Sequence, residues 1–484
     1  MKKPDFKAVG ASLHTRAFRA GGYSVAATAM VLAIAVMVNL FVAALPTGLT
    51  QFDTTDQGLF TLSSQTESLV ENLETDVTIY WIVRRGQEES YLESLLGRYT
   101  AAGEHIRVVK KDPDVYPTFA DAYTDSYSEN SLVVVSGERY RYVDYYDIFV
   151  MDYSSYYYYG QSSWTFDGEN QITSAIDYVV RQDLPKVYTL TGHGEGTLSA
   201  DYTSAVASEN IQLEELSLLT VEGIPADADT VFINAPQSDI SLEEQTKLRE
   251  YLGNGGKVLL ITDPPKNGAL TNLEALLADY GVTAQEGLVV EGNQSYYIWG
   301  TPYYLLPELE SHAVTAPLIN EGYRVLLPVA QGLTVSGELP EAVTVTEFLT
   351  TSSSAFSKTA GYNLTTYEKE EGDIAGPFAL GVAISEEIDD GILSEILWIS
   401  SGALVDDQSN AQASGGNQDL FLNALNYLCG GEESGISIRG KSLDQQKLTL
   451  DSGTASALTA LVIAVVPAAY VAVGIVIWAR RKRR

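Results

Sequence analysis

Residues 251–265 read YLGNGGKVLLITDPP, and this stretch predicts a helix end, a glycine turn and a buried strand in succession. Upstream, Ser241 is followed three residues later by Glu244, which is the pattern of a capping box, so we expect the helix to begin there. The pair Gly255-Gly256 suits its end, because glycine readily adopts the left-handed conformation that often follows a helix. Val258–Thr262 is continuously apolar up to its last residue, as in a strand covered on both faces. The stretch therefore indicates an α/β fold.

The same alternation of strand and helix extends on both sides of this stretch. The expected strands are Lys186–Leu190, Leu213–Leu219, Thr230–Ile233, Gly287–Val290, Phe378–Ile384 and Ile396–Ser400. The expected helices are Leu198–Asn210, Leu273–Tyr280 and Asp419–Leu428. Strands that alternate with helices predict a parallel, doubly wound sheet. Residues 293–375 are weakly patterned and predict no clear elements.

Polar residues follow two of the expected strands directly. Thr191–Gly196 reads TGHGEG, and Asp263 ends the strand of the opening stretch. Ligands of such sheets bind at the carboxyl ends of the strands, so His193, Glu195 and Asp263 are candidate ligand-binding residues. The alternative is structural: the glycines allow a sharp turn, and the polar side chains cap it. The loop lacks the spacing of a Walker phosphate loop, a dinucleotide fingerprint or a nucleophile elbow.

An earlier segment predicts a smaller unit. Its expected elements are a strand at Asp76–Val83, a helix at Glu88–Ala102, a strand at His105–Val109 and a hairpin of Leu132–Val135 with Tyr140–Val143. This β-α-β-then-hairpin order suits a thioredoxin-like unit. The catalytic cysteines of that fold are absent, so its role is structural or binding.

Residues 140–159 are rich in tyrosine, including Tyr156 to Tyr159 in succession. Exposed aromatic residues can stack on sugars or form a protein interface. A Tyr-rich loop or β-arm that packs on its own domain is the other interpretation.

Two long apolar runs, Tyr23–Leu45 and Thr454–Ala479, carry no charged residue. A bilayer core of about 30 Å needs about 20 helical residues, so both runs predict transmembrane helices. Basic residues flank each run on one side only, in residues 1–22 and 480–484. The positive-inside rule then places both termini in the cytoplasm and the intervening body outside the cell membrane.

The composition excludes several classes of function. Acidic residues outnumber basic ones by 63 to 30, giving a net charge of −33, which disfavours nucleic-acid binding. Cys429 is the only cysteine, so disulfide frameworks and cysteine zinc sites are excluded, and we expect a structural role for it. The four histidines are scattered, and Asp406-Asp407 lacks the ligand spacing of an EF-hand. We expect no metal, no cofactor and no catalytic residues.

Several segments, taken in order, resemble the GldG-like auxiliary components of ABC transport systems, a family related to gliding motility. The matching pieces are FTLSSQTESLVENLETDVTIY (60–80), FDGENQITSAIDYV (166–179), VYTLTGHGE (187–195), IPADADTVFINAP (224–236), YLGNGGKVLLITDP (251–264) and GNQDLFLNALNYL (416–428). Pro467, Gly474, Trp478 and Arg480 near the end also match. The resemblance implies a partnership with an ABC-2-type permease and its ATPase. It also implies a glutamine-amidotransferase-like second unit, but Cys429 lies in a late helix and not in a nucleophile elbow, so that activity is not carried over. The Tyr-rich segment departs from the family pattern.

These observations together predict a domain order and a function. The expected domains are a basic cytoplasmic tail (1–22), a transmembrane helix (23–45), a thioredoxin-like domain with the Tyr-rich segment (50–183), an amidotransferase-like α/β domain (184–435), a linker (436–453), a second transmembrane helix (454–479) and a second cytoplasmic basic tail (480–484). The expected function is a non-catalytic, extracytoplasmic accessory subunit of an ABC-2-type transporter. The alternatives are a membrane-anchored ligand-binding or sensor protein, and a surface hydrolase that uses carboxylates such as Glu195 and Asp263.

Overall fold

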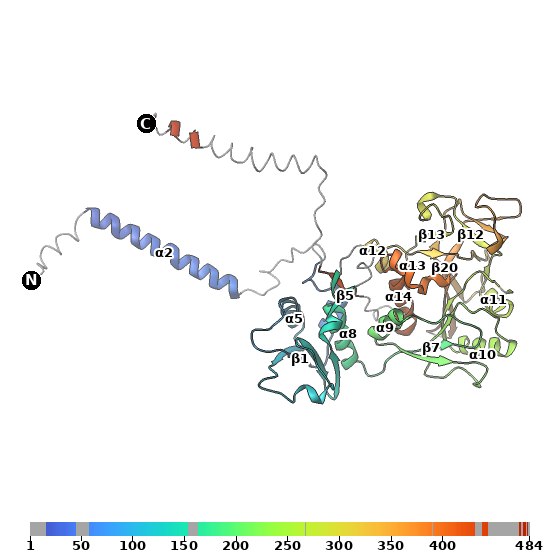
Figure 1. The fold of residues 1–484 in the computed structure, drawn as a ribbon, viewed down its shortest axis with the longest axis horizontal. Coiled ribbons are helices and arrows are strands. Elements are labelled where there is room, and N and C mark those ends of the chain that lie inside the picture. Colours follow the sequence, from blue (N-terminus) through green and yellow to red (C-terminus); the bar gives the residue numbers. More distant parts are fainter. Residues whose placement is uncertain are drawn as a thin grey trace, which may run out of the picture. The chain divides into compact units, whose positions relative to one another are not determined.

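Helix α10 (Leu242–Leu252) and strand β10 (Lys257–Ile261) occupy the expected places around the opening stretch in the computed structural model (Figure 1). Ser241 and Glu244 form the predicted capping box, in which each side chain accepts a hydrogen bond from the backbone N–H of the other. The structure describes residues 16–44, 58–152, 163–266, 268–389, 391–430, 438–443, 474–475, 478–480 and 482.

Five parallel strands form one side of a ten-stranded sheet, with β8 at its edge. They lie in the order β8 (Gln212–Leu216), β7 (Lys186–Leu190), β9 (Thr230–Asn234), β10 and β21 (Ile392–Ile399). The chain enters at β7, adds β8 on one side and then returns to add β9, β10 and β21 on the other. The winding direction therefore reverses between β7 and β9, which is the topological switch point of a doubly wound sheet.

Successive residues of a strand point to opposite faces of the sheet, so a continuously apolar strand needs cover on both faces. Helices provide that cover on each side of these strands. Phe232 faces the layer of α9 (Ala200–Ser208), α12 (Ala316–Glu321) and α14 (Gly416–Gly430). Its neighbour Ile233 faces the layer of α10 and α11 (Thr271–Ala278). The two buried clusters make a three-layer α/β/α core, as the alternation in the sequence predicts.

The remaining strands of the large sheet are antiparallel, so the expectation of a wholly parallel sheet is wrong. Next to β21 lies β20 (Ala379–Asp389), which pairs antiparallel with β21, β17 (Val343–Thr350) and β16 (Leu333–Val335). The antiparallel part ends at β11 (Val282–Ala284) and β14 (Glu308–Leu309). The physical reason is the short connection between β20 and β21, where Gly391 has a φ of 82°. Such a tight turn can join only antiparallel strands.

Short elements occupy residues 288–375, of which residues 293–375 are weakly patterned in the sequence. One small sheet is β12 (Leu288–Val290), β18 (Phe356–Lys358) and β19 (Ile374–Ala375), and another is β13 (Tyr304–Leu305) with β15 (Leu327–Pro328). Helical turns are η2 (Gln294–Tyr296), η3 (Gly361–Asn363), η4 (Gly402–Val405) and α13 (Asp407–Gln412). These elements surround the carboxyl ends of the parallel strands.

The earlier part of the chain has the expected β-α-β-then-hairpin order. Its elements are α4 (Ser64–Glu71), β1 (Val77–Ile82), α5 (Ser90–Ala102), β2 (Ile106–Lys111), η1 (Ala120–Ala122), β3 (Ser131–Ser136), β4 (Arg139–Val143) and α8 (Gly168–Val180). The sheet order is β2-β1-β3-β4, with β1 and β2 parallel and the other pairs antiparallel.

Part of the Tyr-rich segment is ordered into short elements. It contains α6 (Tyr145–Ile148) and β5 (Phe149–Asp152), and β5 joins β6 (Ser163–Phe166) and β22 (Lys441–Ser442) in a three-stranded sheet. Residues 153–162, which include Tyr156 to Tyr159, lie outside the described residues. By its internal contacts the chain divides into one unit of residues 1–150 with 166–441, and a second of residues 151–165 with 442–484.

Glu169 joins the beginning and the end of the first unit. Its side chain is buried and accepts hydrogen bonds from the Ser63 N–H at 2.6 Å and the Thr66 hydroxyl at 2.9 Å. Lys441 Nζ donates to the same carboxylate at 2.8 Å and to the carbonyl oxygens of Gly58 and Thr61. Residues 58–66 and Lys441 therefore meet at the first turn of α8.

The expectation of one transmembrane helix at each end is wrong for the residues that the structure describes: none of their helices combines the length and the apolar character that a bilayer crossing requires. Helix α2 (Arg16–Ala44) covers the first apolar run up to its last residue but one. Most of the run 454–479 lies outside the described residues.

Cys429 lies in the last turn of α14, as the sequence predicts. Its Sγ is 3.6 Å from the Thr230 hydroxyl oxygen. Burial raises the pKa of the thiol to about 11, so at neutral pH it is protonated and a poor nucleophile.

Candidate functional site

The TGHGEG loop follows β7 and crosses the switch point of the sheet. Gly192 and Gly194 have φ values of 120° and 75°, which favour glycine. The His193 carbonyl oxygen accepts hydrogen bonds from the N–H groups of Gln237 and Ser238, at 2.9 and 3.0 Å. These hydrogen bonds therefore connect the loop after β7 to the loop after β9 at the switch point of the sheet.

The His193 imidazole lies between two carboxylates. Its Nδ1 is 2.9 Å from Glu195 Oε1, and its Nε2 is 3.2 Å from Glu244 Oε2. The other Glu195 oxygen accepts the His193 N–H at 2.7 Å. Only 5% of His193 and 2% of Glu244 are exposed. Glu244, the capping residue of α10, thus also holds the far side of the imidazole.

The electrostatics favour a charged Glu244. Burial opposes its ionisation, but hydrogen bonds from Ser241 and the nearby His193 outweigh burial and lower the pKa of Glu244 below its ordinary value of 4.5. In a buried cluster, each carboxylate that stays ionised needs such partners. Within this cluster, each ring nitrogen of His193 faces a carboxylate oxygen.

This geometry provides little for nucleophilic chemistry. Both ring nitrogens of His193 face carboxylates, and the neighbouring Ser238 hydroxyl donates to the His193 carbonyl oxygen and not to the ring. A histidine that activates a nucleophile needs a hydroxyl or thiol on one nitrogen. The arrangement has the form of the structural alternative, in which polar side chains secure the turn.

Asp263 lies at the same edge of the sheet but in a different environment. It follows β10, and its Oδ1 accepts a 2.7 Å hydrogen bond from the Gly402 N–H, which follows the neighbouring strand β21. Strand β9 lies between β10 and β7. The structure therefore brings His193 and Glu195 together, and within the described residues no hydrogen bond joins either one to Asp263.

A cavity of about 360 Å³ opens beside Asp263. Tyr304 and Tyr362 contribute aromatic walls, and Lys266, Asp406 and Gln412 contribute polar groups. Burial and the Asp263 charge raise the pKa of Tyr362 to about 12, so its hydroxyl remains a donor, and it bonds to the Pro264 carbonyl oxygen at 3.2 Å. Aromatic walls with a few convergent polar groups are typical of small-molecule sites. We name this space the Asp263 cavity.

Sequence reasoning identified Asp263 but not the other walls of this cavity. Gly402 and Tyr362 are 139 and 99 residues away from it along the chain, and neither is part of a recognisable motif. A Cβ at Gly402 would lie 2.9 Å from both Asp263 carboxylate oxygens, so the close approach requires glycine. The Ser241–Glu244 capping box was visible in the sequence, but nothing there indicated that Glu244 reaches His193.

Both members of the acidic pair Asp406-Asp407 accept hydrogen bonds from serine residues. Asp406 caps α13 by accepting from the Ser409 N–H at 2.8 Å, and Asp407 accepts from the Ser199 hydroxyl at 2.7 Å. Among the described residues, no group of three or more His, Cys, Asp and Glu side chains is arranged to hold a metal ion.

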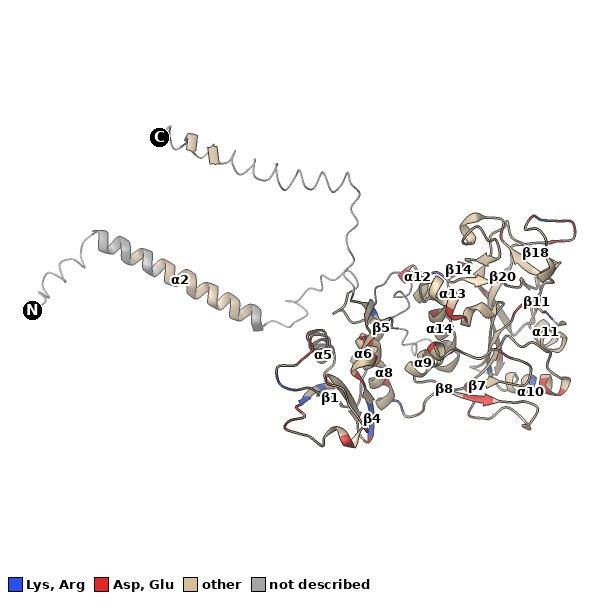
Figure 2. Ribbon diagram, viewed as in Figure 1, with Lys and Arg blue, Asp and Glu red and all other residues tan. Residues whose placement is uncertain are grey.

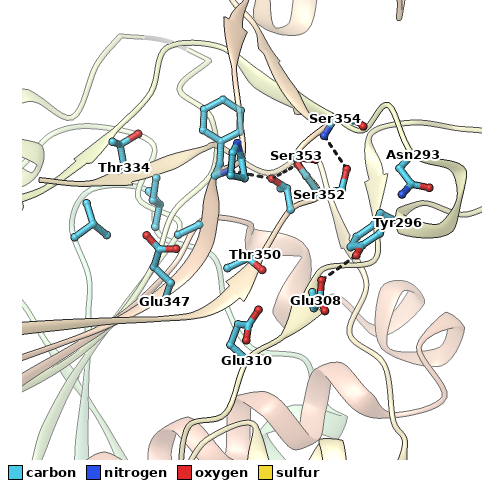
Figure 3. A pocket seen from close by; sticks show the side chains of 16 residues that line it. Asn293, Tyr296, Glu308, Glu310, Thr334, Glu347, Thr350, Ser352, Ser353 and Ser354 are labelled. Carbon is cyan, nitrogen blue, oxygen red and sulfur yellow. Dashed lines mark hydrogen bonds between the residues drawn. The ribbon is translucent and has the colours of Figure 1, made fainter. Parts of the chain in front are cut away.

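A second cavity, of about 520 Å³, lies beside β14, β17 and β20 (Figure 3). Glu308, Glu310 and Glu347 line it together with the hydroxyl residues 350–354, and its lining contains no Lys, Arg or His. Figure 3 shows Tyr296 reaching across to Glu308, a hydrogen bond of 2.9 Å. The lining suits polar solutes. It offers no basic side chain that could work with a carboxylate as an acid–base pair.

Comparison with solved structures gives only remote similarity. The mmIFT52 N-terminal domain matches at 14% identity and a TM-score of 0.37, covering 51% of this chain and 98% of its own. PurLQS from Thermotoga maritima matches at 11% identity and a TM-score of 0.25, covering 51% and 100%. A ThuA-like protein from Bacteroides uniformis ATCC 8492 matches at 11% identity and a TM-score of 0.27, covering 52% and 97%. Such values carry no conclusion about fold or function.

No curated protein matches the sequence. Two family models do match. Residues 56–149 match a family described as a domain of unknown function, and these residues include the sheet β2-β1-β3-β4. Residues 184–424, which contain the large sheet and the Asp263 cavity, match the family described as an ABC-type uncharacterized transport system. This match supports an ABC transporter auxiliary family for residues 184–424.

Proposed function

We propose that the protein is a non-catalytic accessory subunit that works beside the permease and ATPase of an ABC transport system, on the extracytoplasmic side of the cell membrane. The observation that carries the proposal is the family match over residues 184–424. The finer resemblance to GldG-like components, and to an ABC-2-type permease as partner, rests on the ordered motifs in the sequence.

The geometry of the candidate residues supports a binding role more than a catalytic one. His193 and Glu195 are engaged with each other and with Glu244. A hydrolase built on Glu195 and Asp263 would need both carboxylates at one reacting bond, whereas they follow strands that are separated by β9. The Asp263 cavity, in contrast, is open and has the mixed lining of a solute site.

Affinity purification of the full-length protein from membranes in mild detergent tests the partnership. We expect an ABC permease and an ATPase to co-purify and to be identified by mass spectrometry. Recovery of the protein alone in several detergents would contradict the proposal.

A pair of substitutions separates assembly from solute binding. Asp263→Asn should leave co-purification unchanged and reduce transport, because it removes the charge at the mouth of the cavity while its amide oxygen can still accept from Gly402. The control Asp125→Asn changes an exposed aspartate in the earlier α/β segment and should affect neither. Loss of the complex in Asp263→Asn would indicate an assembly role.

The location is tested with an introduced cysteine. In a Cys429→Ser background, Asp125→Cys provides one exposed thiol on the body. We expect a membrane-impermeant maleimide to label it in intact cells. Labelling only after lysis would place the body in the cytoplasm.

A further inference from the structure

Strand β4 places two arginines on one side of the sheet, because residues two apart in a strand share a face. Arg139 and Arg141 both contact the ring of Tyr178 on α8, with their guanidinium carbons 4.7 and 5.2 Å from the ring centre. Figure 2 marks this basic strand in a chain whose net charge is −33. A basic pair is therefore kept in place by an aromatic residue of the neighbouring helix.

Neither arginine forms an ion pair with a carboxylate among the residues that the structure describes. Arg139 donates to backbone carbonyl oxygens, including that of Gln182 at 3.1 Å. Arg141 donates one N–H to the Asn210 side-chain oxygen. Burial lowers the pKa of Arg141, and the favourable charge of Asp147 acts on it without a hydrogen bond between them. Arg141 thus carries a partly desolvated charge without a direct counterion.

A hydrogen-bond network fixes the position of Arg141. Asn210 is buried at a φ of 59°, and its amide donates to the Ser174 carbonyl oxygen and to Asp177 Oδ2, both at 2.9 Å. Asp177 in turn pairs with Arg181 at 3.1 Å. The Asn210 oxygen is thereby oriented toward Arg141. Because a guanidinium has five N–H donors, this single bond leaves most of them for another acceptor.

A cavity of about 390 Å³ lies beside this guanidinium. Its lining includes Tyr140, Arg141, Tyr178, Asn210 and Gln212, and it contains no aspartate or glutamate. The two cavities described above both have carboxylates in their linings. In a protein with 63 acidic residues, this cavity offers a positive charge and hydrogen-bond donors without a competing carboxylate.

We propose that the Arg141 cavity binds a small anion that carries a carboxylate or a phosphate group. The fork of a guanidinium matches two oxygens of either group, and such charge-assisted bonds are stronger than neutral ones. An anion would supply the counterion that the described residues do not provide for this partly buried charge. Arg139, which is on the same face of β4, adds attraction at longer range.

Calorimetric titration of the full-length protein with inorganic phosphate and, separately, with succinate tests the site. We expect one anion to bind per chain, and the tighter of the two probes shows whether a phosphate or a carboxylate is preferred. Arg141→Gln should weaken binding about ten-fold or more, equivalent to about 1.4 kcal/mol or more, as expected for the loss of a charge-assisted hydrogen bond. Arg139→Gln should weaken it only about two- to three-fold, because that side chain contributes charge alone.

Arg107→Gln is the matched control, because it removes the same charge from an exposed position on β2, at the opposite edge of the sheet. It should bind as the unaltered protein does. Equal weakening in Arg107→Gln and Arg141→Gln would mean non-specific attraction and would overturn the proposal. The proposal would also be overturned if neither phosphate nor succinate bound at tens of millimolar.

A thermal measurement covers the possibility that Arg141→Gln folds poorly. A ligand that binds only the folded state raises its melting temperature with concentration. At matched ionic strength, the bound probe should raise the melting temperature of the unaltered protein and of Arg107→Gln above its value in chloride. Arg141→Lys, which keeps the charge but not the fork, should show a smaller rise. An equal rise in Arg141→Lys and in the unaltered protein would contradict recognition by the guanidinium.

Discussion

Two loops at the same edge of the large sheet have opposite characters. In the loop after β7 the His193 side chain is enclosed, because it is held between Glu195 of the same loop and Glu244 of helix α10. The site after β10 remains open, because Asp263 uses one oxygen on the Gly402 N–H and borders a cavity of about 360 Å³. The difference shows that a position at the carboxyl end of a parallel strand can be closed by side-chain contacts or can border a cavity. Side-chain partners decide which.

The largest expected effect is at the filled loop. His193→Ala removes hydrogen bonds to two carboxylates, one of which is 2% exposed, so we expect it to lower the free energy of unfolding by about 3–5 kcal/mol. Urea unfolding followed by circular dichroism measures this. The control is His105→Ala, since His105 is also 2.8 Å from a carboxylate, that of Asp76, but both groups are exposed. Similar losses in the two variants would remove the distinction between the loops.

The next effect depends on pH. Because Glu244 has a lowered pKa in the folded protein, its ionised form stabilises the fold above its ordinary value of 4.5, and this contribution is lost as the pH falls through the folded pKa. Glu244→Gln keeps a residue that can complete the capping box, so we expect a loss of about 1–2 kcal/mol at pH 7.

The loss in Glu244→Gln should shrink below pH 4.5, as unfolding curves between pH 3 and 7 would show. Glu250→Gln changes an exposed residue of the same helix and serves as the control. A deficit in Glu244→Gln that stays constant across this range would mean that the carboxylate charge is not what holds His193.

A substitution at the open site should have a smaller effect on stability than His193→Ala. Gly402→Ala places a methyl group 2.9 Å from both Asp263 oxygens, so Asp263 must move and its 2.7 Å hydrogen bond must lengthen. We expect a loss of about 1–2 kcal/mol, measured by thermal unfolding. Gly337→Ala is the control, since a Cβ there meets no atom within 4 Å. Equal effects would show that Asp263 is not confined by Gly402.

The smallest effect is expected on the aromatic wall. Tyr362→Phe removes one hydrogen bond of 3.2 Å to the Pro264 carbonyl oxygen and keeps the ring, so we expect a change of about 0.5 kcal/mol. Thermal unfolding measures it beside Tyr146→Phe, which alters a more exposed tyrosine. A loss as large as that of His193→Ala would mean that the cavity wall is part of the core.

Much of the local structure follows from short stretches of sequence. The capping box at Ser241 and Glu244, the apolar strand that ends at Asp263 and the β-α-β-hairpin order are all present. The wholly parallel sheet is not, because one tight turn before β21 makes β20 antiparallel. The length of a turn can be read from neighbouring residues, but the position in the sheet of the strands that it joins cannot.

The candidate site residues also divide into contacts that the sequence indicates and contacts that only the tertiary structure shows. The sequence placed His193 and Glu195 in one turn and Asp263 at a strand end, because two-residue spacing and the end of an apolar run are visible locally. It gave no sign that Glu244, 51 residues away, would hold His193, or that Gly402, 139 residues away, would bond to Asp263.

Sequence alone therefore determined the α/β character, the acidic surface and the polar strand ends, since these depend on composition and on neighbours along the chain. Tertiary structure alone decided that the loop after β7 is filled and the site after β10 is open. It also set two arginines of β4 against Tyr178, beside a cavity that has no carboxylate in its lining. The physical reason is that pairing of strands and packing of helices bring together residues whose separation along the chain carries no periodic signal.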